Sequence, residues 1–349
     1  MNAENALKML SAIDDFHLRS SLKGETERHL FIFTMTPFGV EGEKATGGLL
    51  SHSSKVAGTY ALNFIEIIKS IARRRQASFR SIYHRHTRYD GKISISIPNG
   101  TATIVKENEV LKFFFKDKDF FHKLHKKILS ISQYALEEHP NFLLLRMPRF
   151  SPTDSGVDHA EMLSSVIPEL VKINRLPISS ANSEVEFLAV AKIAQLFRLY
   201  DRVDRDGERA YNDIANKLQQ RAEALGASLC HGDFWIDNVM QSTNGYQLID
   251  FDKSVYFTRA YDYVHFFLVS RLSRDRVPLE RFVKNFEAYE QKVISFLEGI
   301  EGIDIAQISS DRIKTSMGLY ALIKLTERDL RTGNVGKSIH LLDNLLEAL

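Results

Sequence analysis

Hydrophobic and polar residues follow two different spacings along the chain. Between residues 93 and 114 they alternate in short runs, which is the period-two pattern of half-buried β-strands. The runs are Ile93–Ile97, Ala102–Val105 and Val110–Phe114, and the Asn99-Gly100 pair between the first two is typical of a tight hairpin turn. The pattern therefore predicts an antiparallel meander of three strands.

Apolar residues beyond residue 150 recur every three or four positions, which is the spacing of amphipathic helices. A further strand, Phe142–Met147, precedes this region, and Ser151–Gly156 is a candidate domain boundary. The two patterns together predict an α+β fold, with a small antiparallel β-rich lobe followed by a larger, mainly helical lobe. The helices are predicted at residues 117–136, 158–174, 184–201, 208–224, 263–272, 279–298, 311–330 and 337–349.

The first 90 residues are the least patterned part of the chain. Helical spacing occurs at 3–22 and 54–72, and a short strand is predicted at 30–33. The basic run from Arg73 to Arg88 is interpreted as a solvated helix end and linker, because it lacks the fold or the amphipathic pattern that nucleic-acid or lipid binding needs. The predicted organisation is an N-terminal extension of unknown role (1–90), a β-rich lobe (91–150) and a helical lobe (151–349).

Composition is that of an ordinary soluble globular protein, with 44% hydrophobic and 26% charged residues in a chain of 349. The single cysteine, Cys230, excludes an internal disulfide, and no apolar run is long enough to span a membrane, so we expect a cytoplasmic protein. Lys and Arg outnumber Asp and Glu before residue 150, and the reverse holds after it. This asymmetry fits an anionic ligand beside the first part and a neutral or cationic one beside the second, or simply an uneven surface charge.

The candidate chemistry is concentrated between Leu229 and Phe267. An aspartate, Asp233, is followed five positions later by Asn238 and then by Asp250 in the sequence Ile-Asp-Phe-Asp. This order suits phosphoryl transfer from a magnesium nucleotide, in which Asp233 orients the substrate hydroxyl while Asn238 and Asp250 supply metal ligands. The alternative interpretation is a polar loop whose aspartates only cap or turn the backbone.

A hairpin is expected to bring the two metal ligands together. Residues 239–241 and 246–248 are predicted strands, joined by the turn-rich segment 242–245. In that register Asn238 lies opposite Ile249, so that Asp250 is about one strand step away.

The meander supplies candidates for nucleotide binding. Lys112 lies on its third strand, where a kinase nucleotide lobe carries the lysine that contacts the phosphates. Asn99, Gly100 and Thr101, in the turn between the first two strands, are further candidates. A surface lysine on an edge strand is the alternative interpretation of Lys112.

The segment resembles the catalytic segment of the aminoglycoside phosphotransferase and choline kinase group, whose pattern is HGDxxxxN followed by IDF. The resemblance covers about residues 91–270. It implies a two-lobed protein-kinase-like fold with a site between the lobes, and transfer of the ATP (or GTP) γ-phosphoryl group, with Mg²⁺, to a hydroxyl of a small acceptor such as an aminoglycoside, amino alcohol or sugar. It further implies that Asp262 supports the catalytic loop and that Asp250, rather than Asp252, is the metal ligand. We expect His231 to brace the loop.

Two features depart from the family pattern. The helix predicted at 117–136 has no glutamate in its middle to pair with Lys112, and the turn at Gly100 is poor in glycine for a phosphate-covering loop. Two alternatives therefore stay open. One is a weak or inactive kinase-like module that binds nucleotide, and the other is a kinase acting on a cell-envelope polysaccharide or a protein, with residues 1–90 recruiting the acceptor. The sequence predicts neither the identity of the acceptor nor the oligomeric state.

Overall fold

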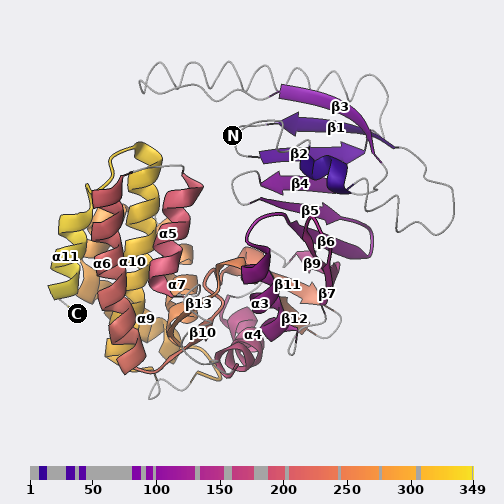
Figure 1. The fold of residues 1–349 in the computed structure, drawn as a ribbon. Coiled ribbons are helices and arrows are strands. Elements are labelled where there is room, and N and C mark those ends of the chain that lie inside the picture. Colours follow the sequence, from indigo (N-terminus) through magenta and orange to yellow (C-terminus); the bar gives the residue numbers. More distant parts are fainter. Residues whose placement is uncertain are drawn as a thin grey trace. The chain divides into compact units, whose positions relative to one another are not determined.

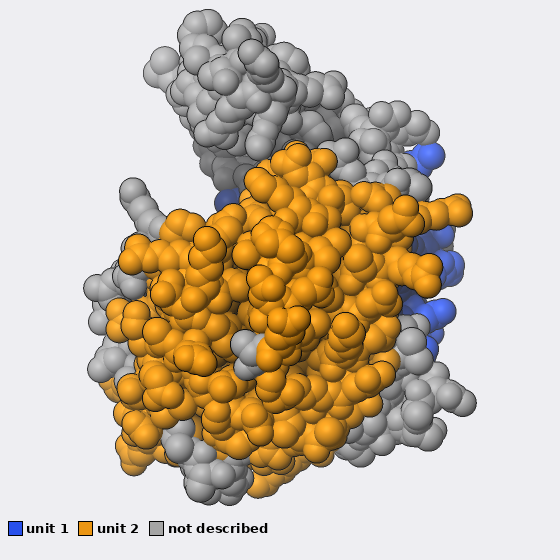
Figure 2. All heavy atoms as spheres, turned by 90° about the vertical axis from the view of Figure 1, so that its left-hand side faces the viewer, with its two compact units in different colours: residues 1–149 blue, residues 150–349 orange. Residues whose placement is uncertain are grey.

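The structure is a computed structural model, and it falls into two compact units. Their bounds are residues 1–149 and residues 150–349 (Figures 1 and 2). The structure describes residues 8–13, 29–35, 39–44, 81–87, 92–96, 100–129, 134–152, 159–176, 188–200, 204–242, 245–274, 277–303, 308–347 and 349.

The first unit is built on one antiparallel sheet with the strand order β3-β1-β2-β4-β5-β6-β8-β7 (Figure 1). Two described helical segments accompany the sheet, the turn at residues 8–13 and α3 (Lys118–Ile128). The strands are β1 (His29–Met35), β2 (Gly39–Lys44), β3 (Ser81–Thr87), β4 (Lys92–Ser96), β5 (Thr101–Val105), β6 (Glu109–Phe114), β7 (Ala135–Glu138) and β8 (Leu143–Pro148).

The predicted meander is confirmed as β4, β5 and β6, and the predicted strand at 142–147 as β8. Gly100 makes the turn into β5 with φ 62°, a left-handed conformation that glycine adopts without strain. The predicted helix 117–136 is wrong in its second half, because α3 ends at Ile128 and β7 begins at Ala135. Pairing with β8 explains the strand: Leu136 lies opposite Leu145, and Glu137 forms an ion pair with Arg146.

The same sheet contains strands from both sides of residue 90. β1 includes the predicted strand at 30–33, and β2 pairs directly with β4. β3 occupies part of the basic run, so the interpretation of that run as a helix end and linker is wrong at residues 81–87. The predicted helix at 54–72 lies outside the described residues, and the one at 3–22 is described only at 8–13, where the chain is helical.

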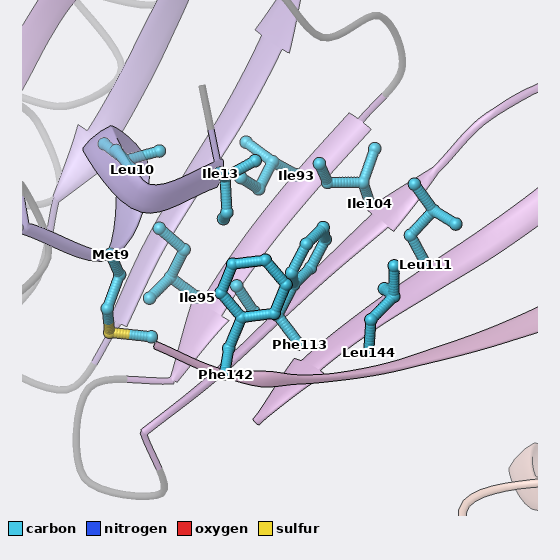
Figure 3. Packing of buried hydrophobic residues seen from close by; sticks show 11 residues of the cluster. Met9, Leu10, Ile13, Ile93, Ile95, Ile104, Leu111, Phe113, Phe142 and Leu144 are labelled. Atoms are coloured by element: carbon cyan, nitrogen blue, oxygen red, sulfur yellow. The ribbon is translucent and has the colours of Figure 1, made fainter. Parts of the chain in front are cut away.

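The core of the first unit lies between this helical turn and the sheet. Met9, Leu10 and Ile13 are buried against a cluster of strand residues (Figure 3). The cluster comprises Ile93, Ile95, Ala102, Ile104, Leu111, Phe113, Phe142 and Leu144. Alternation along β6 sends Phe114 to the opposite face, where its ring stacks on Phe121 of α3 with centroids 4.1 Å apart.

The second unit is mainly helical, with α10 (Ser310–Thr332) packed against α5, α6, α7, α8, α9 and α11. Two small ladders accompany the helices, one of β10 and β13 and the other of β12, β11 and β9. The remaining elements are β9 (Ser151–Pro152), α4 (His159–Asn174), α5 (Ala189–Leu199), α6 (Arg205–Ala224), β10 (Ala227–Cys230), β11 (Val239–Ser242), β12 (Gly245–Leu248), β13 (Val255–Thr258), α7 (Tyr261–Arg274), α8 (Leu279–Lys284), α9 (Phe286–Glu298) and α11 (Ile339–Glu347).

The predicted α+β class, with an antiparallel β-rich part followed by a mainly helical part, is confirmed by these elements. One predicted helix, 279–298, is divided into α8 and α9, because Asn285 leaves the helical conformation at φ −113° and ψ 34°. Among the described residues, no helix combines the length and the hydropathy needed to cross a membrane.

Ile13 tests whether the N-terminal helical turn stabilises the first unit. Ile13→Ala removes a fully buried side chain, so we expect the free energy of unfolding to fall by about 2–5 kcal/mol. Lys8→Ala on the exposed side of the same turn should stay within about 0.5 kcal/mol of the wild type. Chemical denaturation measures both values, and equal stabilities of the two variants would contradict the packing in Figure 3.

Candidate functional site

The loop that carries the candidate catalytic aspartate begins where β10 ends. Cys230 pairs with Val255 of β13, and His231, Gly232 and Asp233 follow directly. Asp262, in the first turn of α7, accepts hydrogen bonds from the backbone N–H groups of His231 (2.8 Å) and Gly232 (2.9 Å). These two bonds confirm the supporting role that the resemblance implied for Asp262.

The Asp262 carboxyl lies in a fully enclosed position. It is 1% exposed, and burial raises its pKa, while His231 and the two backbone N–H groups oppose that rise. The free-energy cost of burying the Asp262 carboxyl is offset only while both loop N–H groups donate hydrogen bonds to it.

Gly232 is required by the shape of the loop. Its φ is +81°, and a Cβ atom built there would lie 1.8 Å from the backbone oxygen of Lys253. Any side chain would therefore separate the loop from the segment that follows the hairpin.

His231 braces the loop from inside. Its ring is fully buried and lies 4.6 Å from the ring of Phe251. Nε2 is 2.8 Å from the Ile249 carbonyl oxygen and Nδ1 is 3.4 Å from the Asp233 amide nitrogen. A carbonyl only accepts and an amide only donates, so Nε2 carries the proton and Nδ1 accepts. Both nitrogens are therefore committed to the backbone, as expected for a bracing residue.

Asp233 lies between Lys253 and His265. Its Oδ2 accepts a hydrogen bond from Lys253 Nζ at 2.7 Å, and its Oδ1 is 3.7 Å from His265 Nε2. Burial by itself raises the pKa of the Asp233 carboxyl, but the charge and hydrogen bond of Lys253, with smaller contributions from His265 and His231, bring it below its ordinary value. The side chain keeps 18% exposure, so the ionised carboxylate remains open to a ligand.

The hairpin after this loop has the predicted register. Val239 lies opposite Leu248, and the Ile249 N–H donates to the Asn238 carbonyl at 3.0 Å. The predicted four-residue connection is shorter, because Ser242 and Gly245 pair with each other and leave two residues in the turn.

Asn238 and Asp250 offer oxygen atoms of the kind that Mg²⁺ binds. The Asn238 amide nitrogen donates to the Asp233 carbonyl at 2.7 Å, which leaves its side-chain oxygen for a cation. Asp250 is exposed and adopts a left-handed conformation with φ 62°. Across the described ranges, no three His, Cys, Asp or Glu side chains form a metal-binding group. The donor set therefore fits a cation that takes its other ligands from phosphate and water.

The first unit contains the candidate nucleotide-binding residues. Lys112 on β6 pairs with Thr103 and Leu145, and its Nζ lies 5.5 Å from the centre of the Phe114 ring. Thr101 is 8% exposed, and the Gly100 carbonyl accepts a hydrogen bond from the Phe115 amide at 2.8 Å. Asn99 lies outside the described residues.

Three residues beside Asp233 were missed by the sequence analysis: Lys253, His265 and Lys192. Lys253 follows the Ile-Asp-Phe-Asp sequence directly, and His265 lies three positions after Asp262 on a predicted helix, which is the one sequence signal that could have found it. Lys192 on α5 is 7% exposed, and burial lowers its pKa to about 7, against the raising effect of Asp252 and Asp233.

Comparison with known proteins agrees with the predicted resemblance. Residues 145–298 match the model of the phosphotransferase enzyme family, which confirms the resemblance stated from the sequence. A search of the curated proteins gives no significant match.

Solved structures of small-molecule kinases are similar to the chain at low sequence identity. Choline kinase LicA from Streptococcus pneumoniae is 15% identical with a TM-score of 0.43, over 71% of this chain and 91% of that one. An ethanolamine kinase from Plasmodium vivax is 10% identical with a TM-score of 0.44, over 71% and 78%. Amicoumacin kinase hAmiN, in complex with AMP-PNP, Ca²⁺ and Ami, is 13% identical with a TM-score of 0.43, over 71% and 85%.

Asp262→Asn tests how the catalytic loop is supported. The amide keeps the shape of the side chain but has one acceptor oxygen, so one of the two loop N–H groups loses its partner. We expect the free energy of unfolding to fall by about 1–3 kcal/mol in chemical denaturation. Asp237→Asn, at an exposed position of the same loop region, is the matched control and should leave stability unchanged. Equal stability of the two variants would show that Asp262 does not support the loop.

Proposed function

We propose that this protein is a kinase that transfers the γ-phosphoryl group of ATP, or of GTP, to a hydroxyl group of a small acceptor molecule. The observation that carries the proposal is the position of Asp233. Its carboxylate stands on a loop held by Asp262 and His231, and the hairpin that follows brings Asn238 beside Ile249 and hence near Asp250. The family match over residues 145–298 supports the same class of reaction.

Asp233 is the group that orients the acceptor hydroxyl and takes its proton. Because Lys253 lowers the pKa of this carboxyl, Asp233 is ionised at neutral pH and can accept a hydrogen bond from the incoming hydroxyl. Lys253 forms the ion pair at 2.7 Å and also places a positive charge next to the reacting oxygens, where negative charge spreads during phosphoryl transfer.

Asn238 and Asp250 are the residues that would hold Mg²⁺. Held by these two residues, Mg²⁺ would supply charge neutralisation to the nucleotide phosphates. The side-chain oxygen of Asn238 fits this role because the amide nitrogen is already committed to the Asp233 carbonyl. The same bond ties the metal ligand to the residue that contains the catalytic carboxylate.

Lys112 is assigned to the nucleotide phosphates, with Asn99, Gly100 and Thr101 in the turn before it. The described part of α3 presents Phe121 and His125 toward Phe114, on the face of β6 to which Lys112 also belongs. No glutamate of α3 can pair with this lysine, because the helix has none. We therefore expect this departure from the family pattern to lower the affinity for nucleotide and to leave the geometry of the transfer step unchanged.

The acceptor belongs to the class of amino alcohols, aminoglycosides and sugars, all of which carry the hydroxyl that Asp233 would engage. The fold does not fix the choice among them, since related helical units differ in the residues that line the acceptor site. A panel of such compounds, assayed for ATP consumption above the rate with water alone, identifies the class.

A cytoplasmic location would agree with the buried thiol of Cys230.

Stabilisation by nucleotide tests whether the protein binds ATP or GTP together with Mg²⁺. A ligand that binds only the folded protein raises stability by about 2.7 kcal/mol at one hundred times its dissociation constant. We expect ATP with Mg²⁺ to raise Tm, and Mg²⁺-free ATP to raise it less. Asp250→Ala should abolish the difference between the two conditions, whereas Asp237→Asn should preserve it. No shift with either ATP or GTP would contradict a nucleotide site.

Turnover by Asp233→Asn tests whether Asp233 takes the proton of the acceptor hydroxyl. The amide cannot accept the hydroxyl proton, so we expect the rate of ATP consumption to fall by about 10²–10⁴-fold, with the nucleotide-induced Tm shift retained. Undiminished turnover in Asp233→Asn would overturn the assignment. A wild-type protein that shows the Mg²⁺-dependent shift but no turnover with any acceptor would instead be a nucleotide-binding module.

A further inference from the structure

His265 occupies a buried position directly behind the catalytic loop. It lies in the first turn of α7, three residues after Asp262, and is 3% exposed. Its ring packs edge-on against Tyr320 of α10, with centroids 5.6 Å apart, and lies 5.8 Å from the ring of Tyr261. The ring is therefore fixed by neighbours on two helices.

Both ring nitrogens of His265 face the loop. Nδ1 lies 3.0 Å from the Phe234 carbonyl oxygen, and because a carbonyl only accepts, Nδ1 must donate. Nε2 lies 3.7 Å from Oδ1 of Asp233. A single side chain thus contacts the backbone just after the catalytic residue and faces its carboxylate.

Burial favours the neutral form of the His265 ring. Burial lowers its pKa to about 4, an effect that Asp233 and the Phe234 carbonyl oppose and that Lys324 of α10 and Lys253 reinforce. At neutral pH the ring therefore carries one proton, on Nδ1. Its contribution is directional, through a hydrogen bond, rather than electrostatic.

Asp262 and His265 bind the backbone on the two sides of Asp233 in sequence. Residues three apart on a helix lie on one face, so both side chains project from the first turn of α7 toward the loop. Asp262 accepts from the N–H groups of His231 and Gly232, before Asp233, and His265 donates to the carbonyl of Phe234, after it. The backbone is therefore held on both sides of the catalytic residue by one rigid helical turn.

We propose that His265 is a positioning residue of the transfer reaction, whose Nδ1–H fixes the Phe234 carbonyl directly after Asp233. The proposal depends on the function proposed above for Asp233. Errors of about 1 Å in the placement of a reacting group can cost about 10²-fold in rate, so loss of this hydrogen bond should lower the rate constant rather than the affinity for nucleotide.

The variants His265→Leu and His265→Asn separate the hydrogen bond from packing. The two side chains have nearly the same shape, but only Asn has an N–H group that can reach the Phe234 carbonyl in place of Nδ1. We expect His265→Leu to lower kcat for ATP hydrolysis with Mg²⁺ by at least about tenfold, at a KM for ATP within about twofold of the wild type. His265→Asn should recover most of that loss. His340→Leu, at an exposed histidine of α11, is the control and should match the wild type.

A second readout does not require turnover. The chain has one tryptophan, Trp235, and it follows Phe234 directly. Its fluorescence therefore reports the loop without interference from other tryptophans. We expect acrylamide to quench Trp235 more strongly in His265→Leu than in the wild type, and to the wild-type extent in His265→Asn.

The outcomes separate this inference from the function on which it depends. Wild-type quenching and kcat in His265→Leu would overturn the positioning role, and so would equal losses in both variants accompanied by equal falls in Tm, which indicate packing alone. If the wild type neither binds nor hydrolyses ATP, the proposed function fails. The difference in Trp235 quenching between Leu and Asn still decides whether His265 positions the loop.

Discussion

The structure of the candidate site depends on the two hydrogen bonds that the Asp262 carboxylate accepts from the loop. A buried carboxylate is costly, and here it is tolerated because two backbone N–H groups, which would otherwise be buried without partners, point at it. These two hydrogen bonds attach the loop to the start of α7. Gly232 makes this close approach possible, since the Lys253 carbonyl occupies the space of any side chain. These constraints fix the backbone just before Asp233, and the contacts of His231 and His265 fix it at Asp233 and Phe234.

Asp233 itself is arranged differently from Asp262. Its ion pair with Lys253 is partly open to solvent, which limits what the pair contributes to stability and leaves it exchangeable. Asp262 has no such opening and serves only the backbone. The carboxylate on the loop, Asp233, and the carboxylate of α7 that supports the loop, Asp262, thus differ in role, because Asp262 is enclosed and Asp233 is accessible. The two roles do not come from a difference in charge. They come from the different exposure of the two carboxylates and from the different hydrogen-bond donors that each one contacts.

The sequence was sufficient to predict features that depend on local pattern. Period-two alternation and a turn gave the register of Asn238 opposite Ile249, and the same rules gave β4, β5 and β6. Features that depend on tertiary packing were not predicted. Lys253 contacts Asp233 across twenty residues of the chain, beyond a left-handed turn at Asp250 that no local pattern indicated. β7 forms a strand through its pairing with β8, although its own residues also suit a helix. β3 escaped prediction for the same reason, as its charged sequence forms a strand beside β1.

The departures from the family pattern and the intact features lie in different units of the chain. The helix without a glutamate is α3 of the first unit, where His125 is buried beside the stacked rings of Phe114 and Phe121. The candidate catalytic residue Asp233, the two metal-ligand candidates and the helical turn that supports the loop all lie between residues 231 and 265 of the second unit, inside the segment that matches the phosphotransferase family. The proposed phosphate contact of Lys112 and the proposed residues of the transfer step therefore belong to different units, while Asn238 and Asp250 would serve both through Mg²⁺. A loss at Lys112 need not imply a loss of the transfer geometry. A weak affinity for ATP would be compatible with a fully formed transfer site, and the two properties have to be measured independently.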